Sequence, residues 1–166
     1  MQIKKNEFNI AFLSRTKQIV NDAFLKNITE YEVTLLLNCC LALICLPLEK
    51  LNSFNVEDSL GEELFKGEIY APSYPDGDPG GTDDMNNYNA VLRALRNGIA
   101  HLGITILNDS NSKKIKGVII IGSYTFSRAG SRHKDYVVEY TFKFSVNQLR
   151  DFVILMADTY LKELLK

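Results

Sequence analysis

The sequence predicts a mainly α protein with one small antiparallel β-hairpin inserted before its last helix. Four segments repeat their apolar residues at helical spacing, and two segments between about 115 and 144 are rich in β-branched and aromatic residues. The chain has 166 residues, of which 46% are hydrophobic and 23% are charged. This is the size and balance of one globular domain, so we expect a single domain over residues 1–166.

The composition excludes several classes of protein, namely disordered chains, collagen and disulfide scaffolds. The three cysteines cannot all pair, and Cys39, Cys40 and Cys45 lie in the apolar run Leu35–Leu48. They are therefore predicted to be reduced core residues, without a zinc site, in a cytoplasmic protein. The same run is too short to span a membrane and contains Asn38, so we expect no membrane segment.

The net charge of −1 conceals an asymmetry along the chain. Residues 1–83 carry 7 basic and 13 acidic groups, a net charge of −6, whereas residues 84–166 carry 12 and 7, a net charge of +5. Such a chain can present a basic surface to nucleic acid, or it can reflect two solvated faces that attract each other. Without a motif, the second interpretation is favoured.

A first helix is predicted over residues 7–26, because apolar residues recur there on one stripe. Arg15 lies within this stripe, and we expect it either to extend past the core or to pair with a carboxylate, with Glu32 as a candidate partner. The stripe consists of Phe8, Ala11, Phe12, Ile19 and Ala23.

A second helix is predicted over residues 29–46, with a capping box at its start and Pro47 after its end. It is apolar nearly all round, which indicates a central helix whose polar residues must find partners. A structural hydrogen-bond network is favoured for Asn38, and a polar strip lining a site is favoured near the helix start. The polar residues on one face are Tyr31, Thr34 and Asn38.

Residues 48–82 are predicted to form a long surface loop, because Gly67–Gly81 contains three prolines and four glycines. Asp76–Asp78 resembles the start of a calcium loop, but the later ligand positions do not fit, so no calcium site is expected. The glycines lack a lysine and lie among aspartates, which argues against a phosphate cradle.

A third helix is predicted over residues 83–102, capped by Thr82, with an apolar face and an opposite polar face. The apolar face contains Tyr88, Val91, Leu92, Leu95, Ile99 and Leu102. The polar face contains Asn86, Asn89, Arg93, Arg96, Asn97, Ala100 and His101. We expect any chemistry to lie on this polar face.

The β-hairpin is predicted over about residues 115–144, and its strands are joined by a basic connection with Arg128, Arg132 and Lys134. This tip is interpreted as an RNA-backbone contact or, equally, as a solvated turn. A last amphipathic helix is predicted over residues 145–165.

The motif that carries the functional prediction is Arg96-Asn97 followed by His101. Arginine offers a charged fork that matches phosphate geometry, and a histidine side chain can transfer a proton near neutral pH. Together these side chains suit phosphoester cleavage.

The Arg96-Asn97 and His101 string fits the R-x4-H signature of the HEPN superfamily. The wider chain resembles a plasmid- and defence-associated HEPN family over most of its length outside the 48–82 loop. The matching segments are Phe12-Leu13-Ser14-Arg15-Thr16 and Tyr31-Glu32-Val33-Thr34 with Asn38 and Pro47.

This resemblance implies a HEPN-type helical bundle that dimerises through its R-x4-H helix and a metal-independent endoribonuclease site, without a cofactor, shared between protomers. The helix supplies one histidine, His101, whereas cleavage through the RNA 2′-hydroxyl needs a proton acceptor and a donor, so a two-fold dimer would provide both. Small residues around the polar face would admit a partner helix, or they are merely good helix formers. These residues are Ala90, Ala94, Gly98 and Ala100.

The expected catalytic residues are His101 as acid and base, Arg96 on the scissile phosphate, and Asn97 orienting the phosphate or His101. Arg93, Glu32 and Tyr31 are supporting candidates, together with the basic tip of the hairpin. The leading prediction is a ribonuclease toxin or antiphage effector, with RNA as substrate and an antitoxin protein as a further partner. The alternatives are a non-catalytic HEPN module that binds RNA, nucleotide or a partner, and a purely structural subunit.

Overall fold

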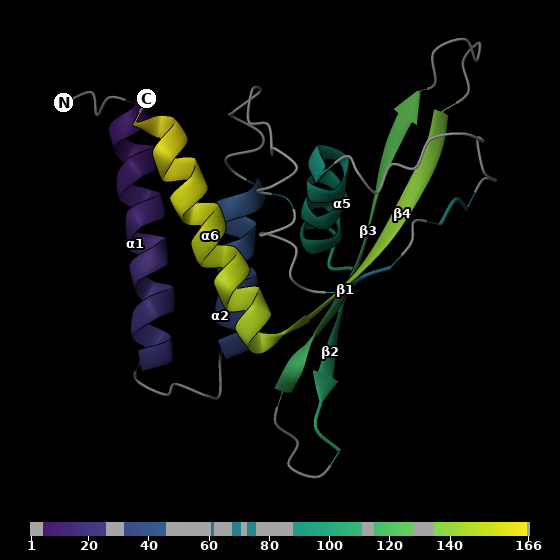
Figure 1. Ribbon diagram of the computed structural model, residues 1–166, viewed down its shortest axis with the longest axis horizontal. Helices are drawn as coiled ribbons and strands as arrows, with labels where there is room; N and C mark the ends of the chain where they lie inside the picture. The colour runs from purple at the N-terminus through teal and green to yellow at the C-terminus, as the bar shows by residue number, and fades with distance from the viewer. Residues whose placement is uncertain are drawn as a thin grey trace. The chain divides into compact units, whose positions relative to one another are not determined.

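The computed structural model describes residues 5–25, 32–45, 61, 68–70, 73–75, 88–110, 115–127 and 135–165 (Figure 1). The chain divides into two compact units. The helical unit combines Met1–Phe54 with Val146–Lys166, and the sheet unit is Asn55–Ser145.

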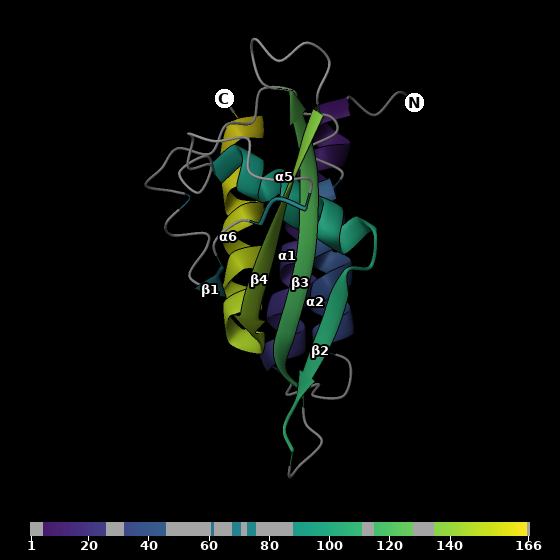
Figure 2. The same cartoon turned by 90° about the vertical axis from the view of Figure 1, so that its right-hand side faces the viewer.

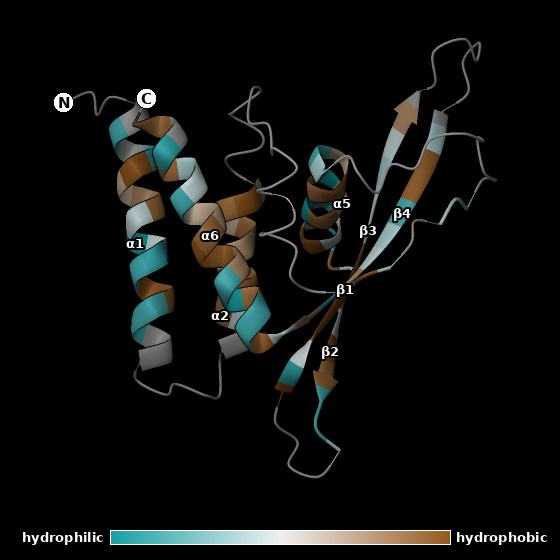
Figure 3. Ribbon diagram, viewed as in Figure 1, coloured by the Kyte–Doolittle hydropathy of each residue, from teal (hydrophilic) through white to brown (hydrophobic). Residues whose placement is uncertain are grey.

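The described residues of the helical unit form three α-helices, and the second continues as a short π-helix. The elements are α1 (Lys5–Leu25), α2 (Glu32–Cys40), η1 (Leu41–Cys45) and α6 (Val146–Leu164). Figure 3 shows α2 as largely apolar, whereas α1 and α6 mix apolar and hydrophilic residues. Lys17 of α1 and Asp158 of α6 form an ion pair with an N–O distance of 2.5 Å. Helices are thus found where they were predicted, at 7–26, 29–46 and 145–165, and the predicted ends at 26, 29 and 46 lie outside the described residues.

The buried stripe of α1 differs from the predicted one. Leu13, Thr16 and Val20 are buried, whereas Ala11 is exposed and Ile19 is 52% exposed. Thr16 can be buried because its Oγ1 donates a hydrogen bond to the Phe12 carbonyl, at 2.9 Å, which satisfies the hydroxyl within the helix. The prediction is therefore wrong at Ala11 and Ile19, whereas Phe12 of the predicted stripe is half-buried and the side chains of Phe8 and Ala23 lie outside the described residues.

The polar residues of α2 also differ from the prediction, since Thr34 and Asn38 are exposed. No buried network around Asn38 is needed. The capping box and Tyr31 lie outside the described residues, as does the side chain of Glu32. Arg15 is exposed.

Two of the predicted core cysteines, Cys39 and Cys40, are buried, as expected. Burial raises the pKa of the Cys39 thiol to about 11, because the low-dielectric core disfavours the thiolate. The side chain of Cys45 lies outside the described residues. In the described part of the chain, no helix is long and apolar enough to cross a membrane.

In the described part of the sheet unit, helix α5 packs against a four-stranded antiparallel sheet in the order β1-β4-β3-β2 (Figure 2). The strands are β1 (Glu68–Ile69), β2 (Ile104–Asn108), β3 (Ile115–Ser127) and β4 (Asp135–Ser145), and α5 is Tyr88–Ala100. β3 and β4 pair along their whole length, from Gly117 with Ser145 to Ser127 with Asp135.

The prediction of a mainly α protein with a small hairpin is therefore wrong, and the fold is α+β. The predicted hairpin is present in the structure, but it is long, with strands of 13 and 11 residues. The sequence pattern predicts no element at Ile104–Asn108, which forms β2, and β1 falls inside the predicted 48–82 loop. Short apolar runs such as Ile104–Asn108 carry little periodic signal, and a two-residue strand carries none.

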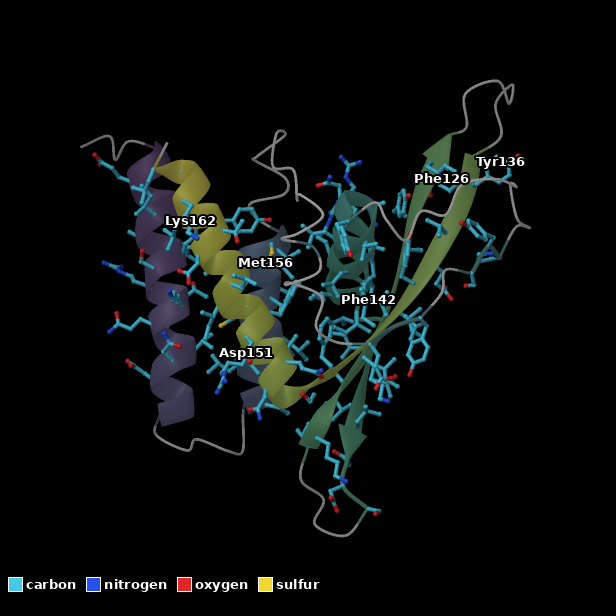
Figure 4. The ribbon with its side chains drawn as sticks, in the orientation of Figure 1. Phe126, Tyr136, Phe142, Asp151, Met156 and Lys162 are labelled. Atoms are coloured by element: carbon cyan, nitrogen blue, oxygen red, sulfur yellow. The ribbon has the colours of Figure 1, made fainter. Side chains whose placement is uncertain are left out.

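The core of the sheet lies on one face, because side chains alternate between the two faces of each strand. Figure 4 shows Phe142 on this sheet beside α5. On the opposite face, Lys143 of β4 contacts Glu68 of β1 at 3.0 Å. The hydrogen bond from Lys143 holds the pKa of Glu68 below its ordinary value, with a smaller effect from the Tyr70 hydroxyl. The buried side chains of the core face are Val118, Ile120, Val138, Tyr140, Phe142 and Phe144.

Candidate functional site

The helix α5 carries the R-x4-H motif, and its two faces differ in burial. Arg93 and Ala100 are exposed, and Asn89, Arg96 and Asn97 are half-buried. The predicted division into an apolar and a polar face is thus largely confirmed within the helix. The buried side consists of Ala90, Val91, Leu92, Ala94, Leu95, Gly98 and Ile99.

The small residues of α5 allow a close approach of β3. A Cβ placed on Gly122 of β3 would lie 1.9 Å from the Ala94 carbonyl oxygen, and one placed on Gly98 would lie 2.7 Å from the Ile121 oxygen. The helix and strand backbones therefore meet where no side chain fits. The expectation that this side admits a partner helix is wrong for Ala94 and Gly98, because β3 of the same chain occupies it. Ala90 is also buried, and Ala100 alone of the four stays exposed.

Asn97 fastens α5 to an otherwise open edge of β3. β2 pairs with β3 only as far as Ile120, and the Ile121 N–H donates to the Gly103 carbonyl at 2.8 Å. The Ser123 carbonyl points to the same edge, because alternate residues of an antiparallel strand direct their backbone groups to the same side. Asn97 Nδ2 donates to this carbonyl at 2.6 Å. The Asn97 amide thus takes the place of a further strand residue.

The end of α5 positions His101 at the surface. The Gly103 N–H donates to the Gly98 carbonyl at 2.8 Å, the Leu102 N–H donates to the Ile99 carbonyl at 3.2 Å, and Leu102 has φ 58°. These are the two hydrogen bonds and the left-handed residue of a Schellman motif. The predicted helix therefore ends earlier than residue 102. Leu102 is 77% exposed and leaves the predicted apolar face.

His101 is the last residue before the left-handed turn, and its side chain is exposed. Its backbone N–H donates to the Asn97 carbonyl at 2.9 Å. Asn97 is therefore tied to His101 by its main chain and to β3 by its side chain. This connection fixes the backbone that carries the imidazole.

The two arginines of α5 differ in environment. Arg93 is exposed, whereas Arg96 is half-buried and its Nε atom is buried. A buried stem restricts the directions that a guanidinium can take, and the remaining N–H groups can donate to an oxyanion. The helix thus combines two permanent cations with one exposed histidine.

The other predicted site residues are not brought to this helix by the described structure. Glu32 is the first residue of α2 in the helical unit, and its side chain is not described. Tyr31 and the basic tip (Arg128, Arg132 and Lys134) lie outside the described residues. Within the described part of the chain, no group of three or more histidine, cysteine or acidic side chains is arranged to hold a metal ion.

Comparison with known proteins identifies the family. The sequence profile of the family described as HEPN pEK499 p136 matches residues 1–165. The chain belongs to this HEPN family. No curated protein and no solved structure matches it. HEPN membership places the chain among nucleases and RNA-binding modules in general.

Sequence reasoning missed two features that support the HEPN motif. The first is the glycine contact between α5 and β3, whose signals in the sequence are Gly98 within an alanine- and leucine-rich helix and Gly122 within a predicted strand. The second is Ser123, which holds Asn97 through a backbone carbonyl. A backbone acceptor leaves no residue-type signal, so its position could come only from the fold.

Proposed function

We propose that this HEPN protein is a metal-independent endoribonuclease that cleaves RNA by attack of its own 2′-hydroxyl, leaving a 2′,3′-cyclic phosphate and a 5′-hydroxyl. The observation that carries the proposal is the exposed His101 at the Schellman end of a helix that also bears Arg93 and Arg96. An imidazole in solvent contact can reach a substrate hydroxyl, and the neighbouring guanidinium groups can hold the phosphate.

Each residue has a distinct role in this reaction. His101 accepts the proton of the 2′-hydroxyl or donates a proton to the leaving 5′-oxygen. Arg96 binds the scissile phosphate and stabilises the charge that develops on it. Asn97 is a positioning residue, since it connects the His101 backbone to β3. Arg93 adds a phosphate contact from the solvent side.

The test is cleavage of total RNA in EDTA by purified variants. His101→Ala is expected to reduce the cleavage rate about 10²–10⁴-fold, because it removes the acid–base group. Removing a charge-stabilising group is expected to cost about 10²–10³-fold for Arg96→Ala. Lys162→Ala, which removes an exposed cation from the last turn of α6, is the matched control and keeps the wild-type rate. Undiminished cleavage by an Arg96→Ala/His101→Ala double variant would show that the activity does not use this helix.

The proposal includes a homodimer with a shared site, because one histidine cannot act as acid and base at once in a single cleavage step. Wild-type protein that exchanges subunits with an excess of His101→Ala protein is then expected to lose most of its cleavage, because each heterodimer has one histidine where the step needs two. Cleavage that stays proportional to the amount of wild-type protein, although exchange is shown by mass spectrometry, would mean that each protomer acts alone.

We further propose that the activity serves as a toxin or antiphage effector. Induction of the wild-type protein is expected to arrest growth, and His101→Ala is expected to abolish the arrest while the protein accumulates to the same level. Arrest that is independent of Arg96 and His101 would instead favour a non-catalytic HEPN module.

The basic tip of the hairpin is proposed to hold the RNA backbone. Charge reversal at Arg128, Arg132 and Lys134 is expected to weaken binding to RNAs of any sequence and to reduce the salt dependence of binding. Unchanged affinity at low salt would remove the tip from the RNA-binding surface.

A further inference from the structure

The outer half of the β3–β4 hairpin carries a row of aromatic rings. The ring centroids of Tyr124 and Phe126 on β3 are 5.9 Å apart, and those of Phe126 and Tyr136 across the hairpin are also 5.9 Å apart. Phe126 pairs directly with Tyr136 in the ladder, next to the point where β3 ends and β4 begins. Figure 4 labels both residues at this end of the hairpin. The three rings, named here the aromatic row, share one face of the sheet.

The aromatic row continues the core face of the sheet but is more accessible. Tyr140 and Phe142, further along β4, are 0% exposed and Phe144 is 1% exposed. Tyr124, Phe126 and Tyr136 are all half-buried, so part of each ring contacts solvent. Buried cross-strand pairs such as those of Tyr140 and Phe142 stabilise the inner part of the hairpin. The rings of the aromatic row instead leave part of their apolar surface in contact with water. This arrangement leaves ring surface available to a ligand.

One polar side chain of the motif helix reaches β3 next to the aromatic row. Asn97 reaches Ser123, the residue before Tyr124, through the 2.6 Å hydrogen bond. Arg93 lies one turn before Asn97 on the same side of α5 and is exposed. A permanent cation and a row of rings are thus presented from one compact unit.

We propose that the aromatic row is a stacking platform for the unpaired bases of single-stranded RNA that lead into the cleavage site, an inference that rests on the proposed ribonuclease function. Aromatic side chains on a sheet face bind bases of any sequence, because every base has a π-face. Unpaired RNA fits better than duplex, since the bases of a duplex are stacked on each other. The net charge of +5 over residues 84–166 favours an anionic ligand.

The test measures binding without cleavage. In the His101→Ala protein, affinity is measured by fluorescence anisotropy for three labelled probes, namely a 12-nucleotide oligoadenylate, the same backbone without bases, and a 12-base-pair RNA duplex. Phe126→Leu/Tyr136→Leu keeps the apolar bulk of the hairpin but removes two rings. Phe126→Tyr keeps a ring, and Thr125→Ala changes an exposed residue on the opposite face of β3.

The double leucine variant is expected to bind oligoadenylate at least about 10-fold more weakly and the base-free probe with unchanged affinity. The duplex affinity is also expected to stay unchanged, and Phe126→Tyr and Thr125→Ala are expected to bind all three probes as the parent does. Oligoadenylate affinity equal to that of the parent in the leucine variant, at an unchanged melting temperature, would overturn the platform and leave the rings to a protein partner. An equal loss for all three probes would overturn it as well. Because no cleavage is measured, failure of the platform and failure of the ribonuclease proposal are separate results.

Discussion

The contact between Gly122 of β3 and α5 gives the sharpest test of the fold around the motif. In Gly122→Ala, the added Cβ would lie 1.9 Å from the Ala94 carbonyl oxygen, 2.7 Å from its carbon and 2.9 Å from the Gly98 nitrogen. All three are backbone atoms, so no side chain can rotate away. The first separation must grow to the 3.4 Å at which ordinary contacts begin, about 1.5 Å more, which requires α5 to move away from the strand.

The expected free-energy change follows from two opposing effects. Overpacking of this severity is expected at the upper end of its usual range, about 3 kcal/mol. Replacing glycine restricts the unfolded chain and returns up to about 1 kcal/mol. The net loss is about 2 kcal/mol, and about 3 kcal/mol if the displaced helix also loses the hydrogen bond from Asn97 to Ser123.

The assay is urea unfolding at 25 °C followed by circular dichroism, with Thr125→Ala as the control on the same strand. The control is expected to stay within about 0.5 kcal/mol of wild type, because its side chain is exposed. A Gly122→Ala protein as stable as wild type would mean that α5 does not rest on β3 as described, and the positioning of His101 would lose its basis.

The remaining predictions concern the neighbouring residues and the pH dependence. Leu102→Gly is expected to stabilise the protein by about 0.5–1 kcal/mol in thermal unfolding, because Leu102 has φ 58°, a left-handed conformation that glycine adopts without strain. Little contact is lost, since Leu102 is 77% exposed. A lower melting temperature of the variant would contradict the Schellman end of α5. Asn97→Ala is expected to cost about 1 kcal/mol and to lower the cleavage rate with little change in KM, and a change in KM alone would argue against positioning. Since the folded pKa of Cys39 is raised from 9.0 to about 11, the stability from its neutral thiol is complete below pH 9 and is lost as the pH rises toward 11; a Cys39→Ala protein lacks this loss, and identical pH profiles of the two proteins between 9 and 11 would refute it.

The elements that the sequence predicted well are those with strong periodicity. The alternation of Val138, Tyr140, Phe142 and Phe144 predicts the hairpin. The two faces of α5 are also predicted correctly, except at Leu102 and at the small residues Ala90, Ala94 and Gly98, which are buried. The end of α5 was missed because a left-handed leucine carries no residue-type signal, unlike a glycine.

The predicted buried faces of α1 and α5 are wrong where one sequence pattern is compatible with two different packing arrangements. The α1 sequence contains two apolar stripes, and only the fold decides that Leu13 and Val20, rather than Ala11 and Ile19, face the core. The small residues of α5 permit a close approach by a helix or a strand, and β3 is the neighbour found at Gly98. The periodicity of a sequence indicates that one face of a helix is packed, but it does not identify the helix or strand that packs against that face.

The candidate site shows the same division. Residue types and spacing placed Arg96, Asn97 and His101 on one helix, and this is a local property of the chain. The partner of Asn97 is 26 positions away on β3, and its acceptor is a backbone oxygen, so it could not be read from the sequence.

We propose that this helix catalyses RNA cleavage through the 2′-hydroxyl. The most direct test of this proposal is an analysis of the product ends formed in EDTA. Wild-type protein is expected to leave 2′,3′-cyclic phosphate and 5′-hydroxyl ends on a defined single-stranded RNA, and His101→Ala is expected to leave the RNA intact. Products with 3′-hydroxyl and 5′-phosphate ends, or the same cyclic ends from His101→Ala at the wild-type rate, would contradict it.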